Sequence, residues 1–126
     1  MPIKRVDVTP VYVNDQDAAL DFFVNKLGFE KVRDDPMGPE ARWVQVKPSG
    51  AETSLALVKG FGDWSPEKVG GLQPMTFWSD DANATAEELR QAGVGITQDP
   101  TPQPWGMNEV RFRDADGNEY LLYGPS

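Results

Sequence analysis

The sequence predicts an α+β fold of two βαβββ modules, whose strands form a half-barrel-like mixed sheet with the helices outside. Three observations support this prediction. Apolar runs typical of strands surround two helical patterns, each helical pattern follows an acidic capping run, and the same order of elements occurs twice. Residues 15–23 and 81–89 lie about 66 positions apart (81 − 15 = 66) and have matching capping and apolar roles. This spacing is a repeat of half the chain rather than the short period of a solenoid.

The first module starts with a strand and a helix. A β-branched stretch around Tyr12 predicts the strand, with apolar side chains at Val6, Val8, Val11 and Val13. Pro10 lacks an amide proton, so we expect this strand at an edge or a bend. Residues 14–17 offer capping side chains, and apolar residues spaced three and four apart over 18–27 predict a helix that ends at Gly28. Three further strands are predicted at 29–33, 41–47 and 53–58.

Glycine and proline interrupt the pattern after the first module. They predict a linker over residues 60–71, between modules at about 1–59 and 72–126 of a single domain. The second module repeats the first. It is predicted to have a strand at 75–79, a helix at 82–92 after the cap formed by Asp80 and Asp81, and strands at 94–97, 109–113 and 118–123. Residues 114–118 read as a hairpin turn rather than a calcium loop, because they lack its length and spaced ligands.

Composition limits the possible functions. With 39% hydrophobic residues the chain can bury a core, and no apolar run approaches the roughly 20 residues that span a bilayer. The opening residues lack the apolar stretch of a signal peptide, so we expect a cytoplasmic protein. The chain has no cysteine and no histidine, which excludes disulfides, thiolate nucleophiles and imidazole as a base or ligand. A formal net charge of −8 disfavours nucleic acid and anionic membranes and favours small cationic partners.

Several stretches match a known family pattern. They are residues 11–15, followed by 21–23 and 27–29, and the Phe-Arg-Asp-Ala-Asp-Gly-Asn run at 112–118. With these motifs the chain resembles the vicinal oxygen chelate superfamily of glyoxalases, bleomycin resistance proteins and extradiol dioxygenases, over nearly its whole length. Ala115 stands where the turn of the family has proline.

Two local features are similar to the bleomycin-resistance type within that superfamily. One is Thr9-Pro10-Val11 in the first strand, and the other is the loop Gln103-Pro104-Trp105-Gly106. This resemblance implies a metal-free protein that sequesters an antibiotic. It also implies a homodimer, in which a second chain covers sheet edges and apolar surface.

The resemblance also indicates where a metal would be held. Enzymes of the superfamily bind a divalent metal through inward histidine or glutamate side chains on corresponding strands. The matching positions in this chain are Val8, Ala56, Pro74 and Leu121. None of these side chains can ligate a metal, so we expect neither a metal nor another cofactor, and neither glyoxalase nor dioxygenase chemistry.

Aromatic side chains are the remaining candidates for a binding site. The predicted ligand-binding residues are Tyr12, Trp43, Trp64, Trp78, Trp105 and Phe112. Trp64 and Trp105 stand out because each lies in a loop rich in glycine and proline, where a large ring has less core to fill. Aromatic faces attract cations and planar rings, so the expected ligand is a flat or cationic small molecule.

Two other functions remain open at this point. One is a metal-independent lyase, isomerase or hydrolase with a carboxylate as general base. Its candidate bases are Asp7, Glu40, Glu52, Glu109 and Glu119, for each of which a solvated surface charge is the commoner role. The other function is a small-molecule sensor or carrier. Sequestration predicts stoichiometric binding with the ligand recovered intact, whereas an enzyme predicts a new product after many turnovers.

The side chains at the four metal positions lead to a first prediction. We expect the purified protein to contain no stoichiometric transition metal, because Val8, Ala56, Pro74 and Leu121 supply no ligand atoms. Elemental analysis measures this directly. One tightly held zinc, iron, nickel or manganese ion per chain would contradict the prediction.

Overall fold

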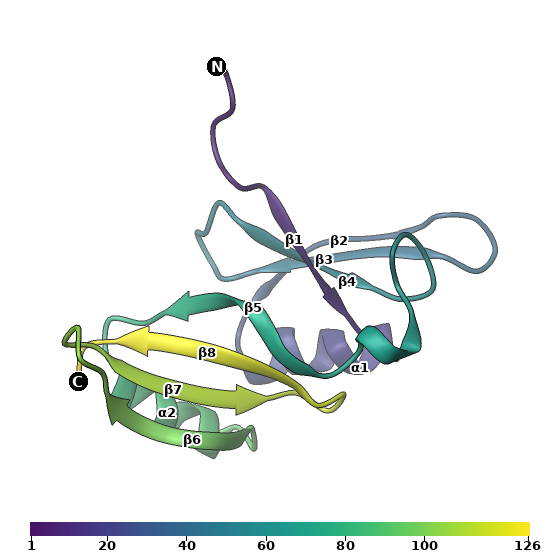
Figure 1. The fold of residues 1–126 in the computed structure, drawn as a ribbon. Helices are drawn as coiled ribbons and strands as arrows, with labels where there is room; N and C mark the ends of the chain where they lie inside the picture. The colour runs from purple at the N-terminus through teal and green to yellow at the C-terminus, as the bar shows by residue number, and fades with distance from the viewer. The chain divides into compact units, whose positions relative to one another are not determined.

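The structure is a computed structural model that describes residues 1–126, and it consists of two compact units, Met1–Val69 and Gly70–Ser126. Each unit contains one four-stranded mixed sheet with a helix packed against one face (Figure 1). This is the α+β fold with two modules that the sequence predicts. A helix able to cross a bilayer would have to be longer and more apolar than any that this chain forms.

The first unit has its strands in the order β1-β4-β3-β2. Its elements are β1 (Val8–Tyr12), α1 (Gln16–Leu20), β2 (Glu30–Pro36), β3 (Arg42–Lys47) and β4 (Ser54–Val58). β1 pairs only with β4, in parallel, so Pro10 lies on an edge strand as expected. Asp15 caps α1, because its carboxylate accepts a hydrogen bond from the Ala18 amide at 3.0 Å. The helix continues through a π-helical segment, Asp21–Lys26, which carries the buried Phe22 and Phe23.

The second unit repeats this plan with the strand order β5-β8-β7-β6. Its elements are β5 (Gly71–Trp78), α2 (Ala82–Gln91), β6 (Gly95–Pro102), β7 (Asn108–Arg113) and β8 (Asn118–Gly124). Asp81 caps α2 as predicted, through the Ala84 amide at 2.9 Å. β5 begins four residues before the predicted strand at 75–79 because it is an edge strand, which tolerates Pro74, and its pairing is irregular between Leu72 and Thr76.

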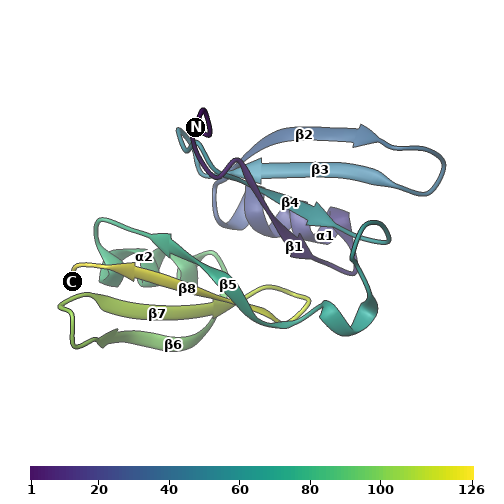
Figure 2. The ribbon, with the colours of Figure 1, turned by 45° about the horizontal axis from the view of Figure 1, so that its top comes forward.

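Both sheets bury the face that carries the helix, and β4 of the first sheet is buried at all five of its positions, on both faces. In the first unit, Val11, Val44, Val46 and Leu57 are almost fully buried. In the second unit, the residues buried on the helix side of β7 and β8 are Val110, Phe112, Tyr120 and Leu122. Figure 2 shows α1 and α2 each lying along its own sheet, on one side of it. Because side chains alternate along a strand, the intervening residues point to the face without a helix.

A hairpin turn joins β7 to β8, as the sequence predicts. The Asp114 carboxylate accepts hydrogen bonds from the backbone amides of Asp116 and Asn118, at 2.9 and 3.0 Å. It also accepts from the Tyr120 hydroxyl at 2.7 Å. Gly117 has a φ of 81°, the left-handed conformation that favours glycine. The turn is therefore held by its own side chains, and it fixes the start of β8.

The end of β8 makes a close approach that only glycine fits. A Cβ atom on Gly124 would overlap the Ser79 carbonyl oxygen. Backbone hydrogen bonds keep the two segments together, since Ser79 donates to Tyr123 at 2.9 Å and Ala82 donates to Pro125 at 2.8 Å.

We expect Gly124→Ala to lower the free energy of unfolding by about 1–3 kcal/mol, because the backbone has to shift to make room. Urea denaturation measures the change. Gly95→Ala is the matched control, since a Cβ there meets only flexible side-chain atoms of Arg113, at 3.4 Å or more. Equal effects of the two substitutions would contradict the prediction.

Candidate functional site

The helix-free face of the second sheet carries polar and aromatic side chains. Three residues are aligned across neighbouring strands, because Trp78 on β5 pairs with Tyr123 on β8 and Tyr123 pairs with Glu109 on β7. Their neighbours along the strands, Phe77 and Leu122, belong to the opposite face with the core. We call the aligned residues the Trp78–Tyr123–Glu109 row.

Glu109 is the centre of a hydrogen-bond network on this face. The residue is only 7% exposed. One carboxylate oxygen, Oε2, accepts from the Tyr123 hydroxyl at 2.7 Å. The other, Oε1, accepts from Arg111 Nε at 3.0 Å and from Gln98 Nε2 at 3.1 Å. Arg111 also lies 3.7 Å from a carboxylate oxygen of Glu119. A buried charge is thus paired with a cation and with two neutral donors.

The network shifts the titration of its members. The hydrogen bond from Tyr123 lowers the pKa of Glu109, and those from Arg111 and Gln98 lower it further, against the effect of desolvation. The same bond to Glu109 raises the pKa of the Tyr123 hydroxyl. At neutral pH the carboxyl is therefore charged and the phenol neutral. Both pKa values move away from neutrality, where general acid or base catalysis works best.

The burial of Glu109 differs from the expectation of a solvated surface charge. Alternation along β7 places Glu109 on the face opposite Val110, which a sequence pattern can show. What buries it is the approach of Gln98 from β6 and Tyr123 from β8. Strand pairing brings these residues together, and no local signal in the sequence indicates it.

Two tryptophans at this row are exposed, Trp78 within it and Trp105 beside Tyr123. Trp105, in the loop before β7, is 59% exposed, and its ring centroid lies 5.6 Å from that of Tyr123 at an interplanar angle of 61°. Trp78 is 61% exposed, and its indole nitrogen donates to Asp80 at 3.1 Å. Large aromatic rings left open on a sheet face are typical of binding surfaces.

Phe112 does not share this surface. It is 2% exposed and packs on the core side of the sheet against Phe77 and Tyr120, with ring centroids 6.2 and 5.4 Å away. Residues 110 and 112 alternate with 109 and 111, so the register of β7 directs Phe112 toward α2.

The other three predicted aromatic residues belong to the first unit. Trp43 lies 6.4 Å from Phe61, and its indole nitrogen donates to the side chain of Gln45 at 2.9 Å. Trp64 donates to the carbonyl of Val13 at 2.9 Å, which fastens its loop to the end of β1. The ring of Tyr12 carries a cation of the chain itself, since Lys68 Nζ lies 5.9 Å from the ring centroid.

The four expected metal positions do not fit a divalent metal. Val8 and Ala56 lie on β1 and β4 of the first unit, and Pro74 and Leu121 lie on β5 and β8 of the second. Their side chains contain no oxygen, nitrogen or sulfur donor. In addition, no three acidic side chains of the chain come together in a group that could hold a metal ion.

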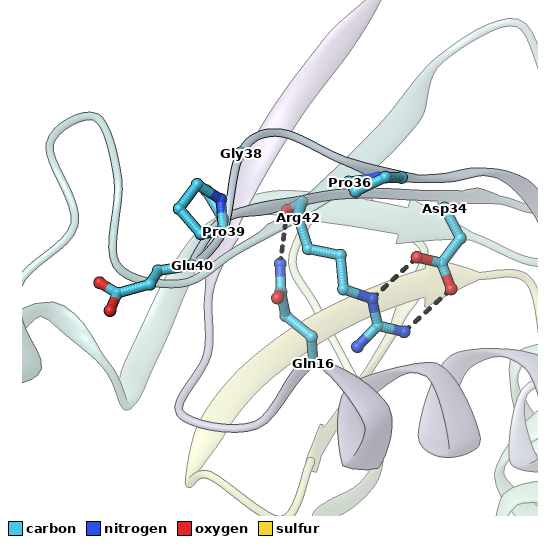
Figure 3. Close-up of a pocket in the computed structure, with 8 residues that line it drawn as sticks. Gln16, Asp34, Pro36, Gly38, Pro39, Glu40 and Arg42 are labelled. Carbon is cyan, nitrogen blue, oxygen red and sulfur yellow. Dashed lines mark hydrogen bonds and ion pairs between the residues drawn. The ribbon is translucent and has the colours of Figure 1, made fainter.

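A polar cavity of about 440 Å³ lies in the first unit (Figure 3). Arg42 dominates it, with hydrogen bonds at 2.8 and 2.9 Å to both carboxylate oxygens of Asp34 and an ion pair at 2.8 Å to Asp17. Gln16 donates to the carbonyls of Arg42 and Leu57, at 2.9 and 2.8 Å. These contacts tie α1 to β3 and β4, so the cluster stabilises the unit.

Comparisons with known proteins agree with this fold. The sequence profile of the Glyoxalase/Bleomycin resistance protein/Dioxygenase superfamily matches residues 5–121. The uncharacterized protein YetH of Bacillus subtilis is 38% identical over 125 residues, which are 95% of this chain and 98% of that protein. A superfamily member from Sphaerobacter thermophilus has a TM-score of 0.87 and 37% identity, covering 98% of this chain and 99% of its own.

A second solved structure, TnmS3 of Streptomyces sp. CB03234, is described as an antibiotic binding protein. It has a TM-score of 0.84 and 40% identity, and the match covers 100% of this chain and 99% of that chain.

The network around Glu109 leads to a prediction about pH. A carboxyl with a lowered pKa in the folded state adds stability above its unfolded pKa of about 4.3, and this stability is lost as pH falls through the folded value. Tyr123→Phe removes the main cause of the lowered pKa. We therefore expect its cost in the free energy of unfolding to be larger at about pH 7 than at about pH 3.

Urea denaturation of the wild type and of Tyr123→Phe at both pH values measures this difference. In a Glu109→Gln background the cost of Tyr123→Phe should no longer depend on pH. The same cost at both pH values in the wild-type background would show that Tyr123 does not stabilise the charged carboxylate.

Proposed function

The chain belongs to the glyoxalase/bleomycin resistance protein/dioxygenase superfamily, and on this basis we propose that it is a small-molecule binding protein of the bleomycin-resistance type. It sequesters a planar, cationic compound and releases it unchanged. The likeness to TnmS3, at 40% identity over the whole chain, supports a binding function of this kind.

The observation that carries the proposal is the surface around the Trp78–Tyr123–Glu109 row. Trp78 and Trp105 keep more than half of their surface exposed on one unit, beside a carboxylate that is charged at neutral pH. An exposed ring offers a face for stacking and for cation–π contact. The net charge of −8 favours a cation.

The same surface gives little support to the alternative of a metal-independent enzyme. Such an enzyme needs a group that takes up and releases a proton near neutral pH. Glu109 is the buried carboxyl on this face, and its hydrogen bonds lower its pKa away from that range. A sensor or carrier would use the same surface without chemistry, and it would bind the ligand just as reversibly. The homodimer, the cytoplasmic location and the absence of a metal stay predictions from the sequence.

We expect metal-free bleomycin or the planar cation aminoacridine to quench tryptophan fluorescence when it binds. Trp105→Ala should weaken that binding roughly two- to thirtyfold, since a cation–π contact is worth about 0.5–2 kcal/mol. Added salt should have a smaller effect, because it screens charges beyond about 8 Å but leaves stacking in place. Fluorescence titration and calorimetry measure affinity and stoichiometry, and chromatography of the released compound shows whether it is intact.

Met37→Ala is the matched control, because Met37 is an exposed apolar residue of the first unit and is 40% exposed. It should leave affinity unchanged. Unchanged affinity in Trp105→Ala, together with a steep loss of thermal stability, would make Trp105 a structural residue. Failure of every planar cation to bind would exclude this class of ligand, and a new product formed over many turnovers would favour the enzyme.

A further inference from the structure

The hydrogen bonds of Glu109 determine which way the Tyr123 hydroxyl points. An ionised carboxylate can only accept hydrogen bonds, so each of its partners has to donate. Tyr123 Oη lies 2.7 Å from Glu109 Oε2, and its single proton is used in this bond. The structure contains no other hydrogen bond to this hydroxyl. A molecule that reaches Tyr123 from the open face therefore meets an oxygen with free lone pairs and no proton to offer.

Trp105 offers an exposed ring next to Tyr123 on which a planar ligand could stack. Its ring lies edge-on to the ring of Tyr123, with 5.6 Å between centroids, and it is 59% exposed. A planar group stacked on the exposed ring of Trp105 would lie beside Tyr123, because the two ring centroids are 5.6 Å apart. The atoms on the edge of that group facing Tyr123 then decide whether a hydrogen bond forms.

We propose that Glu109 is a specificity-determining residue, which makes Tyr123 a hydrogen-bond acceptor and so selects planar ligands that carry an amino, ammonium or hydroxyl donor on the edge facing it. This inference rests on the proposed binding function and adds the class of ligand. A carbonyl or other acceptor next to Tyr123 faces the lone pairs of its hydroxyl oxygen, whose proton is held by Glu109. Desolvating two acceptors without a proton between them is unfavourable, so such ligands are rejected.

The surroundings of Glu109 also predict what Glu109→Gln does. Arg111 Nε and Gln98 Nε2 both donate to Oε1, at 3.0 and 3.1 Å, so the oxygen of a glutamine has to occupy that place. The amide nitrogen then faces Tyr123 and donates to it. The Tyr123 hydroxyl becomes free to donate its own proton to a ligand. The substitution thus reverses the hydrogen-bond polarity of this surface while it preserves the shape of the side chain.

Three planar probes of the same ring system test the proposal. Aminoacridine is a cation with an amino donor, N-methylacridinium is a cation without a donor, and N-methylacridone is neutral with a carbonyl acceptor. In the wild type, aminoacridine should bind about two- to tenfold more tightly than N-methylacridinium, the range expected for one net hydrogen bond. The comparison of two cations separates hydrogen bonding from charge.

In Glu109→Gln the ratio of the two cation affinities should fall to about one, since Tyr123 no longer accepts from the ligand. The affinity for N-methylacridone should rise above its wild-type value. Tyr123→Phe is the second variant, because it removes the acceptor and leaves the carboxylate in place. It should abolish the preference between the two cations without a gain for N-methylacridone. Circular dichroism shows whether each variant folds, and calorimetry gives the affinities.

The outcomes separate this inference from the proposed function. The binding function stands and the role of Glu109 is refuted in two cases. In the first, both cations bind the wild type with equal affinity. In the second, Tyr123→Phe keeps the wild-type ratio of the two cation affinities. If Glu109→Gln folds and N-methylacridone gains nothing, the reversal of polarity is refuted. If no probe binds the wild type, both the proposed function and this inference fail.

Discussion

Side-chain alternation along β7 and β8 is the constraint on which the second unit depends. Val110 and Phe112 have to reach the core beneath α2, and this requirement sends Glu109 and Arg111 to the opposite face. A shift of one residue in the pairing would exchange the two sets. The turn held by Asp114 prevents such a shift, because it fixes where β8 begins. The composition of the open face is thus a consequence of how the core is packed.

The Glu109 carboxylate on that face is buried, so side chains of neighbouring strands have to compensate its charge. Burying an unpaired charge is costly, and Glu109 avoids this cost with donors from three strands, Arg111 beside it on β7, Tyr123 on β8 and Gln98 on β6. Each donor loses some freedom in forming the network. The result is a set of side chains whose hydrogen bonds have defined directions before any ligand arrives. Such preorganisation reduces what a ligand has to order when it binds.

The sequence was sufficient for features that depend on local chemistry. The capping residues Asp15 and Asp81, the edge position of Pro10 and the hairpin turn at 114–118 all follow from residue types at short spacing. Features that depend on strand register could not be predicted from the sequence. An aromatic residue such as Phe112 looks equally suited to a core and to a binding face until its partners are known. The burial of Glu109 needs residues from three strands, and no short window of sequence contains them.

The two units show why aromatic content alone is a weak guide to ligand preference. In the first unit the ring of Tyr12 has a cation of the chain beside it, because Lys68 lies 5.9 Å from its centroid. A cationic ligand at that ring would have to displace Lys68 and overcome its repulsion. In the second unit the ring of Trp105 is 59% exposed, and the Glu109 carboxylate that holds the neighbouring Tyr123 hydroxyl is itself paired with Arg111. The charge placed beside a ring, rather than the number of rings, therefore decides how readily that ring can receive a cation.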